Sequence, residues 1–282
     1  MVSTLQPRRF RRASQRAAKR YSTDLSDQEW DIIRPLLPPP SAGRGRKRQV
    51  DEREILNAIF YQIHNGCIWS DLPKDLPAWQ TVYKYFRRWQ RKGVWQAIHD
   101  QLRREVRVSV GKKPQATAGS IDSQSVKTTE KRGPVYGFDG GKKVKGRKRF
   151  ILVDTLGLVI SVLVVEANCS EQRGGAFVVH EADPRALESM QLIWVDQGYQ
   201  GENFARVVQQ MCGAKVEVVK RTEVGFVLLP KRWIVERTFG WLNQNRRLSK
   251  DYELLPEMSE AMIQGAMIRI MLQRLGERQE KV

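Results

Sequence analysis

Three carboxylates, Asp122, Asp196 and Glu236, stand where they could act together on a phosphodiester. Asp122 lies near the end of a short predicted strand, residues 118–123, and Asp196 ends a buried predicted strand, residues 192–196. Glu236 lies in a predicted amphipathic helix, residues 232–250. Mg²⁺ and Mn²⁺ prefer carboxylate oxygens, and two ions about 3.5 to 4 Å apart can activate a nucleophile and stabilise the leaving oxygen. Because converging acids repel one another without a cation, the pattern predicts a two-metal site.

The helix that carries Glu236 is compatible with two interpretations. Val235, Phe239 and Leu242 repeat at i, i+4 and i+7, which predicts one buried face. A second face holds residues that suit a cation and a phosphate-bearing ligand: Arg232, Glu236, Gly240, Asn243 and Arg247. The alternative is an ordinary solvated face, in which Glu236 pairs with Arg232 or Arg247 while the two aspartates cap turns.

Composition narrows the range of partners. The 282 residues include 49 Lys and Arg against 31 Asp and Glu, a formal net charge of +18. So basic a chain most often meets a polyanion, which makes nucleic acid the leading predicted partner and an anionic membrane surface the alternative. No run approaches the roughly 20 apolar residues of a spanning helix, and no apolar signal-peptide core follows the basic N-terminus. We therefore expect no membrane partner and a cytoplasmic, nucleoid-associated location. Three distant cysteines indicate neither disulfides nor zinc.

The first part of the chain reads as a basic tail, residues 1–20, followed by a helical DNA-binding domain, residues 21–113. Ser26 and the acidic turn after it predict a helix start, and the prolines at 38–40 predict its end. Further helices are predicted at 51–65, 79–92 and 94–108. The glycine-spaced arginines of residues 43–48 form a basic loop that could enter a groove.

The predicted helix at residues 79–92 resembles the recognition helix of a helix-turn-helix module. Its aromatic and apolar residues repeat at helical spacing and are predicted to be core: Trp79, Val82, Phe86 and Trp89. Its basic residues would then point outward as a ridge that contacts DNA: Lys84, Arg87, Arg88 and Arg91.

Beyond a linker at residues 109–114 the pattern becomes that of an α/β domain, residues 114–282. Two β-branched runs, 150–153 and 159–165, predict a hairpin. A helix near 175–187 and a strand at 216–219 are also predicted. Residues 141–149 read as a basic loop, whose expected phosphate contacts are Lys142, Lys143, Lys145, Arg147, Lys148 and Arg149.

The order of these elements resembles the RNase H-like catalytic domain of bacterial insertion-sequence transposases with an Asp-Asp-Glu triad. Segments 121–127, 194–201 and 232–239 are similar to the family's three acid-bearing motifs, and residues 141–157 to its basic loop and hairpin. The resemblance runs from Tyr21 to about Leu275. It implies an α/β fold, with a mixed central sheet flanked by helices after an N-terminal helix-turn-helix-like domain.

This resemblance implies a transposase that binds the terminal inverted repeats of an insertion sequence. Two Mg²⁺ (or Mn²⁺) ions held by Asp122, Asp196 and Glu236 would support DNA cleavage, and the freed 3′-hydroxyl would then attack target DNA. The implied partners are double-stranded DNA and further copies of the chain, as a homodimer or higher assembly in the synaptic complex. Additional DNA contacts are implied for Tyr199, Arg232, Arg246 and Arg247.

Two positions depart from the broader group's pattern: Leu229 stands where a tyrosine is expected and Asn243 where a lysine is expected. Our hypothesis is that Arg246 or Arg247 makes the phosphate contact of the missing lysine. The segment 171–175 also lacks the acids often found before that helix. Two other functions stay open: a metal-dependent nuclease of the same fold, and a non-catalytic DNA-binding protein such as a decayed copy or repressor.

Overall fold

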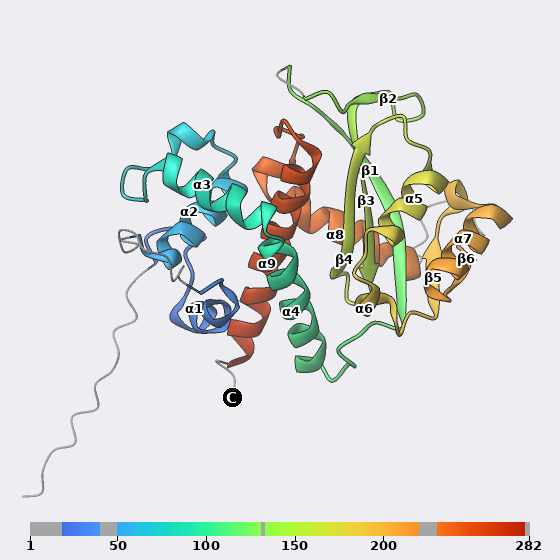
Figure 1. Cartoon of the computed structure of the whole chain (residues 1–282), viewed down its shortest axis with the longest axis horizontal. Helices are drawn as coiled ribbons and strands as arrows, with labels where there is room; N and C mark the ends of the chain where they lie inside the picture. The colour runs from blue at the N-terminus through green and yellow to red at the C-terminus, as the bar shows by residue number, and fades with distance from the viewer. Residues whose placement is uncertain (1–18, 40–49, 131–132, 220–229, 280–282) are drawn as a thin grey trace, which may run out of the picture.

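A computed structural model describes residues 19–39, 50–130, 133–219 and 230–279 (Figure 1). Most of the predicted basic tail, the basic loop at 43–48 and Leu229 lie outside the described residues. The first three helices and the sheet lie on opposite sides of the long C-terminal helix α9, Pro256–Gln279, and the fourth helix runs alongside α9. None of the described helices is both long and apolar enough to cross a membrane.

The N-terminal part is helical, as predicted. Helix α1, Asp27–Ile33, begins with a capping box, in which the Ser26 hydroxyl accepts from the Glu29 amide and the Glu29 carboxylate accepts from the Ser26 amide. A 3-10 turn, η1 (Arg34–Leu36), follows. Helix α2, Glu52–Asn65, ends at Gly66, whose φ of 74° is the left-handed conformation that glycine adopts without strain.

Helix α3, Trp79–Arg91, and helix α4, Val94–Ser109, complete this part, and the 3-10 turn η2 (Trp69–Asp71) joins α2 to α3. Val82, Phe86 and Trp89 are buried, as the spacing predicts. The prediction for Trp79 is wrong, since 37% of this residue is exposed. Trp79 is the first residue of α3, so no preceding turn of helix covers it.

A six-stranded mixed sheet forms the second part of the molecule. The strands are β1 (Ala118–Lys127), β2 (Gly137–Asp139), β3 (Val144–Asp154), β4 (Val159–Glu166), β5 (Leu192–Val195) and β6 (Lys215–Val218). Strand β3 is antiparallel to β1, β2 and β4, whereas β5 lies between β1 and β6 and is parallel to both. The predicted hairpin is confirmed as β3 and β4, and the strand prediction at 216–219 as β6.

Two strands are longer than predicted. Strand β1 continues to Lys127, so Asp122 lies in mid-strand and not near its end. Strand β3 begins at Val144, so most of the predicted basic loop is sheet. Its charges led to the loop prediction, but arginine side chains are compatible with a strand when the fold supplies partners for their guanidinium groups.

Helices cover both faces of the sheet. One face packs against α5 (Glu171–His180), α6 (Pro184–Leu187) and α7 (Glu202–Cys212) through a separate apolar cluster. The other face packs against α8 (Pro230–Asn243) and α9, and its apolar cluster continues into the N-terminal helices. Val235, Phe239 and Leu242 of α8 are buried in this cluster, as predicted.

Helix α8 ends earlier than predicted, at Asn243, and residues Arg246–Leu248 form a separate 3-10 turn, η4. The Asn245 side-chain amide donates to the carbonyl groups of Trp241 and Leu242, at 3.3 and 3.4 Å. An asparagine that bonds the backbone in this way competes with helix continuation. Arg247 therefore does not lie on the Glu236 face of α8.

Candidate active site

The sheet register brings Asp122 and Asp196 side by side. Ser120 of β1 pairs with Trp194 of β5 in a parallel ladder, and two residues further along each chain lie the two aspartates. Residues two apart on a strand face the same side, and neighbouring strands are about 4.8 Å apart. Both aspartates are half-buried and line one small pocket together with Val235 of α8.

Backbone amides orient both carboxylates. An Asp122 Oδ1 accepts from the Ser123 amide at 2.7 Å. An Asp196 Oδ1 accepts from the Gly198 amide at 2.9 Å, which caps the 3-10 turn η3, Gln197–Tyr199. The alternative that an aspartate caps a turn is thus confirmed for Asp196. Capping occupies one lone pair of the carboxylate and leaves its oxygens able to coordinate a cation.

Glu236 lies on the helix that covers these aspartates. Its neighbour Val235 lines their pocket, whereas Glu236 itself is exposed. Asn243, two turns later on the same stripe of α8, lies with its Oδ1 3.5 Å from Nε2 of Gln124. Gln124 and Asp122 face the same side of β1, so the Glu236 stripe runs along the strand that carries Asp122. All three acids therefore lie on the α8 side of the sheet.

The three acids do not form a closed cluster. In the described ranges no group of three or more His, Cys, Asp and Glu side chains is arranged to hold a metal ion. The two aspartates supply the hard oxygen donors that Mg²⁺ and Mn²⁺ require, in a pocket that partly excludes water. The resemblance implies Glu236, which is exposed on α8, as the third ligand.

Tyr199 does not lie at the surface, so the predicted contact with the DNA backbone is wrong. Only 1% of the residue is exposed, and its ring packs 5.6 Å from that of Phe204. Burial raises the pKa of the Tyr199 hydroxyl well above its usual value, and the charges of Asp122, Glu171 and Asp196 raise it further. This tyrosine supports the pocket from within the α5–α7 core.

Glu171 is an acid near this pocket that sequence reasoning missed. It is the first residue of α5, and its Cγ and Asp196 Oδ1 both lie 3.1 Å from the position that a Cβ on Gly198 would take. Glu171 accepts from the Lys148 ammonium at 3.2 Å, and that lysine also pairs with Asp139 at 3.5 Å. The sequence signal for Glu171 was its position directly after the helix-capping residue Ser170, because acids are favoured in the first turn of a helix.

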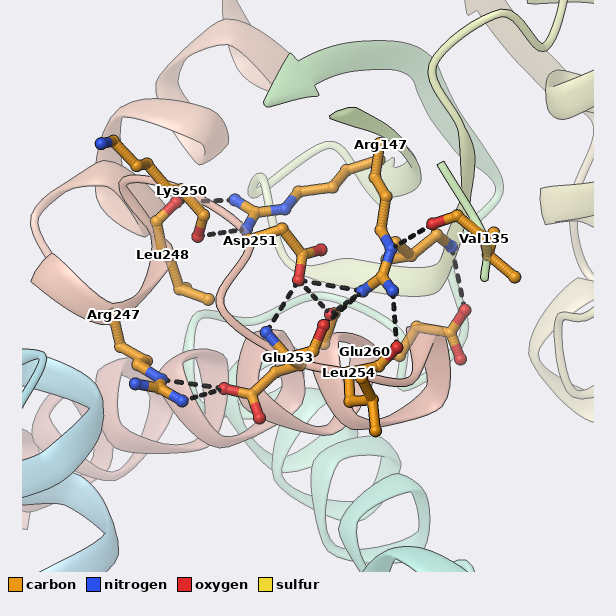
Figure 2. Close-up of polar contacts among 12 residues, drawn as sticks. Val135, Arg147, Arg247, Leu248, Lys250, Asp251, Glu253, Leu254 and Glu260 are labelled. Atoms are coloured by element: carbon orange, nitrogen blue, oxygen red, sulfur yellow. Dashed lines mark hydrogen bonds and ion pairs between the residues drawn. The ribbon is translucent and has the colours of Figure 1, made fainter. Parts of the chain in front are cut away.

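The structure also corrects the expected phosphate contacts of β3. Arg147, Lys148 and Arg149 are buried and bonded within the chain, so they are not available to DNA. Figure 2 shows the Arg147 guanidinium paired with Asp251 and donating to the carbonyls of Val135 and Leu254. Arg149 donates to the carbonyls of Leu248 and Lys250, at 2.7 and 3.1 Å. These arginines fix the segment that joins α8 to α9.

Arg247 is likewise unavailable to DNA. It is buried and pairs with Glu253, with 2.6 Å between Nη2 and Oε1 (Figure 2). Because its guanidinium already has a carboxylate partner, Arg247 cannot replace the missing lysine at position 243. Arg246 is exposed, and the side chain of Arg232 lies outside the described residues.

Other predicted basic residues are on the surface. Lys142, Lys143 and Lys145 are exposed around the start of β3. A groove of about 550 Å³ runs along α3, and the predicted basic ridge lines it: Lys84, Arg87, Arg88 and Arg91. Arg88 stacks on Tyr85 at 4.4 Å and Arg87 on Tyr83 at 5.9 Å. Aromatic stacking holds these guanidinium groups in place along the groove.

A mixed sheet with two acids on adjacent parallel strands, covered by a helix that carries a third, defines the class of RNase H-like catalytic domains. The family described as "Transposase DDE domain" matches residues 113–271, and that described as "Putative transposase of IS4/5 family" matches residues 25–99. The chain therefore belongs to the DDE transposases of the IS4/5 group. This confirms the expected family and the expected fold class.

Three relatives were compared with the chain. The "Insertion element IS402 uncharacterized 16.2 kDa protein" of Burkholderia cepacia is 30% identical over 108 residues, 36% of this chain and 72% of the relative. The "Putative transposase for insertion sequence element IS402" of the same organism is 28% identical over 131 residues, 44% of this chain and 60% of the relative. "Uncharacterized protein y4sN" of Sinorhizobium fredii (strain NBRC 101917 / NGR234) is 31% identical over 81 residues, 29% of this chain and 64% of the relative. For the last two, the match covers less than two thirds of the relative.

Proposed function

We propose that this protein binds the terminal inverted repeats of an insertion sequence and catalyses divalent-metal-dependent cleavage and transfer of DNA strands. The observation that supports it most directly is the register-adjacent pair Asp122 and Asp196 in one pocket under α8. Asp122, Asp196 and Glu236 would hold two Mg²⁺ or Mn²⁺ ions. When bound, such ions activate an oxygen nucleophile and stabilise the leaving oxygen of a phosphodiester.

The residues of the chain have distinct proposed roles in this reaction. Asp122 and Asp196, oriented by backbone amides, set the position of the scissile phosphate relative to the sheet. Glu236 completes the ligand set from α8, on the side from which DNA approaches. The open face beside Gly240, where a Cβ would meet no atom within 4 Å, leaves space for the sugar-phosphate backbone.

DNA is held, in this proposal, by two basic surfaces. The groove along α3 contacts the inverted repeat through Lys84, Arg87, Arg88 and Arg91. The exposed residues Lys142, Lys143, Lys145 and Arg246, together with Arg232, contact phosphates nearer the cut. The assembly would contain two or more copies of the chain, one for each element end, at the nucleoid in the cytoplasm. The division into a DNA-binding domain, 21–113, and a catalytic domain, 114–282, is part of the same proposal.

The test uses Asp122→Asn, Asp196→Asn and Glu236→Gln, which remove charge and keep shape. We expect each to lose metal-dependent cleavage of a DNA duplex that ends in the element's inverted repeat, while affinity for that duplex is retained. Glu188→Gln serves as the matched control, because it removes an exposed carboxylate directly after the last residue of α6. Full cleavage by all three variants would refute the assignment. Strand transfer from pre-cleaved ends separates a transposase from a nuclease of the same fold.

A further inference from the structure

A second basic cavity, of about 410 Å³, lies where the end of α4, the β3–β4 turn, α8 and the end of α9 meet. Val106, Val110 and Leu156 form its apolar wall. Its other lining residues are Arg237, Trp241, Arg274, Glu277 and Arg278. None of the site residues predicted from the sequence lies here, and the cavity is separate from the α3 groove.

Two guanidinium groups of this cavity stack on one indole. Arg237 lies 4.8 Å and Arg274 4.4 Å from the ring centre of Trp241. Arg237 also lies 4.6 Å from the ring of Trp233, one turn earlier on α8. Stacking on aromatic faces orients a guanidinium and leaves its N–H donors free to point sideways at a ligand.

The described part of the chain offsets the positive charge of this cavity only in part. In the part of the chain that the structure describes, neither Arg237 nor Arg274 has a carboxylate within ion-pair distance. Glu277 lines the cavity without pairing with either arginine, and the nearby Asp154 is already paired with Arg107 at 2.6 Å. Burial lowers the pKa of Arg274 and the charge of Arg237 lowers it further, while the charge of Asp154 raises it in part. An anion would relieve this repulsion.

The bonding of the guanidinium groups also indicates a missing partner. Arg237 donates from Nη2 to the Leu156 carbonyl at 3.0 Å, while its Nε is buried with no hydrogen-bond partner. Arg278 donates to the Ser109 carbonyl, which ties α9 to the end of α4. A buried donor without a partner is costly, and phosphate oxygens are well matched to guanidinium donors.

Nearby residues of α8 line the two sites, Val235 in the candidate active site and Arg237 in this cavity. Arg237 follows Glu236 in the sequence. Trp233, Arg237 and Trp241 form one stripe of α8, and Trp233, which is 38% exposed, extends this stripe to the protein surface. We propose that this cavity binds a backbone phosphate of the DNA strand that reaches Glu236, with Arg237 and Arg274 as its ligands. The inference that the cavity binds an anion is argued from the cavity itself. That this anion is a DNA phosphate rests on the proposed function.

The experiment measures DNA affinity of the full chain in EDTA, by fluorescence anisotropy with a short labelled duplex of mixed sequence, between about 50 and about 200 mM KCl. Loss of one phosphate contact should reduce the slope of log affinity against log salt by about 0.9. We expect this reduction for Arg274→Gln, with about tenfold weaker binding at low salt. Arg274→Lys, which keeps the charge, should retain the slope.

Arg185→Gln is the matched control, because Arg185 is exposed on α6 and the substitution removes the same charge as Arg274→Gln does. Equal slopes for Arg274→Gln and Arg185→Gln would overturn the proposal. Should Arg274→Gln fail to fold by circular dichroism, Arg237→Gln replaces it with the same expected and contrary outcomes. Since binding in EDTA needs no catalysis, the slope can change even if the chain proves unable to cleave DNA, so the two proposals fail separately.

Discussion

The ion pair between Arg147 and Asp251 is completely enclosed: Nη1 and Oδ1 are 3.0 Å apart and neither side chain is exposed to solvent. Arg147 lies in β3, and Asp251 lies in the segment between α8 and α9. The same Nη1 also donates to the carbonyl of Glu253 at 2.9 Å. This pair therefore connects the centre of the sheet to the segment that follows the helix carrying Glu236.

Arg147→Met should lower the free energy of unfolding by about 3–5 kcal/mol, because it leaves the Asp251 carboxylate buried without its cation. Urea denaturation followed by circular dichroism measures the change. Lys145→Met, two residues earlier and exposed, is the control and should stay within about 0.5 kcal/mol of the original protein. Similar losses in both variants would show that the enclosed pair does not stabilise the fold.

Glu260 should make stability depend on pH. Burial raises its pKa from 4.5 to about 7, and the charges of Glu181, Glu257 and Asp251 also raise it. The hydrogen bond that the Val164 amide donates to Glu260 lowers the pKa in part. With its folded-state pKa above the unfolded one, the contribution of Glu260 to stability is fully present below about pH 4.5 and is lost as pH rises through about 7. The loss is on the order of 3 kcal/mol.

Glu260→Gln removes this titration, so its unfolding free energy should change much less than that of the original protein between pH 5 and pH 8, a range of about 3 units. Thermal or urea unfolding at several pH values provides the comparison. Glu188→Gln, an exposed carboxylate, should keep the original profile. If Glu260→Gln retains the full pH dependence, another buried group is responsible.

Gly240→Ala should separate stability from activity. Gly240 lies inside α8 with open space where a Cβ would be, so alanine should stabilise the helix by about 0.5–1 kcal/mol. On the Glu236 stripe, however, the methyl group would occupy space proposed for the DNA backbone and should slow cleavage. Gly174→Ala, also helical, would place a Cβ 2.1 Å from the Phe150 ring and should cost about 1–3 kcal/mol. Faster cleavage by Gly240→Ala would contradict the proposed DNA path.

Arg91→Gln tests the groove along α3. Arg91 is exposed and lines this groove, so losing a phosphate contact should lower the salt slope of DNA binding by about 0.9. Arg206→Gln, exposed on α7, provides a charge-matched comparison and should leave the slope unchanged. An identical slope for the two variants would place DNA elsewhere.

Local chemistry was sufficient to predict many elements. The helix start at Ser26 and the 3.6-residue repeat of Val235, Phe239 and Leu242 are encoded within a few residues, and both predictions were confirmed. The proximity of Asp122 and Asp196 could be expected from the resemblance, but their register depends on strand pairing across more than seventy residues of chain, as in the Ser120–Trp194 pair.

The basic residues were harder to assign, because their environment depends on distant partners. Nothing near Arg147 or Arg149 in the sequence shows that Asp251 and the carbonyls after α8 will surround them. Lys143 and Lys145, only a few residues away, remain exposed. The prediction for Tyr199 was wrong for the same reason. Its burial depends on the packing of α5 against the turn that follows β5.

Helix α9 closes the core of the N-terminal helices, with Met262, Met267 and Met271 fully buried in the shared cluster. These helices are synthesised first, yet their apolar faces are covered only after the whole sheet has left the ribosome. During translation the nascent helices would expose those faces, which favours aggregation or chaperone capture. A product released before α9 would lack the helix that completes the core of the N-terminal helices, so premature termination should yield no stably folded fragment that competes with the full-length chain.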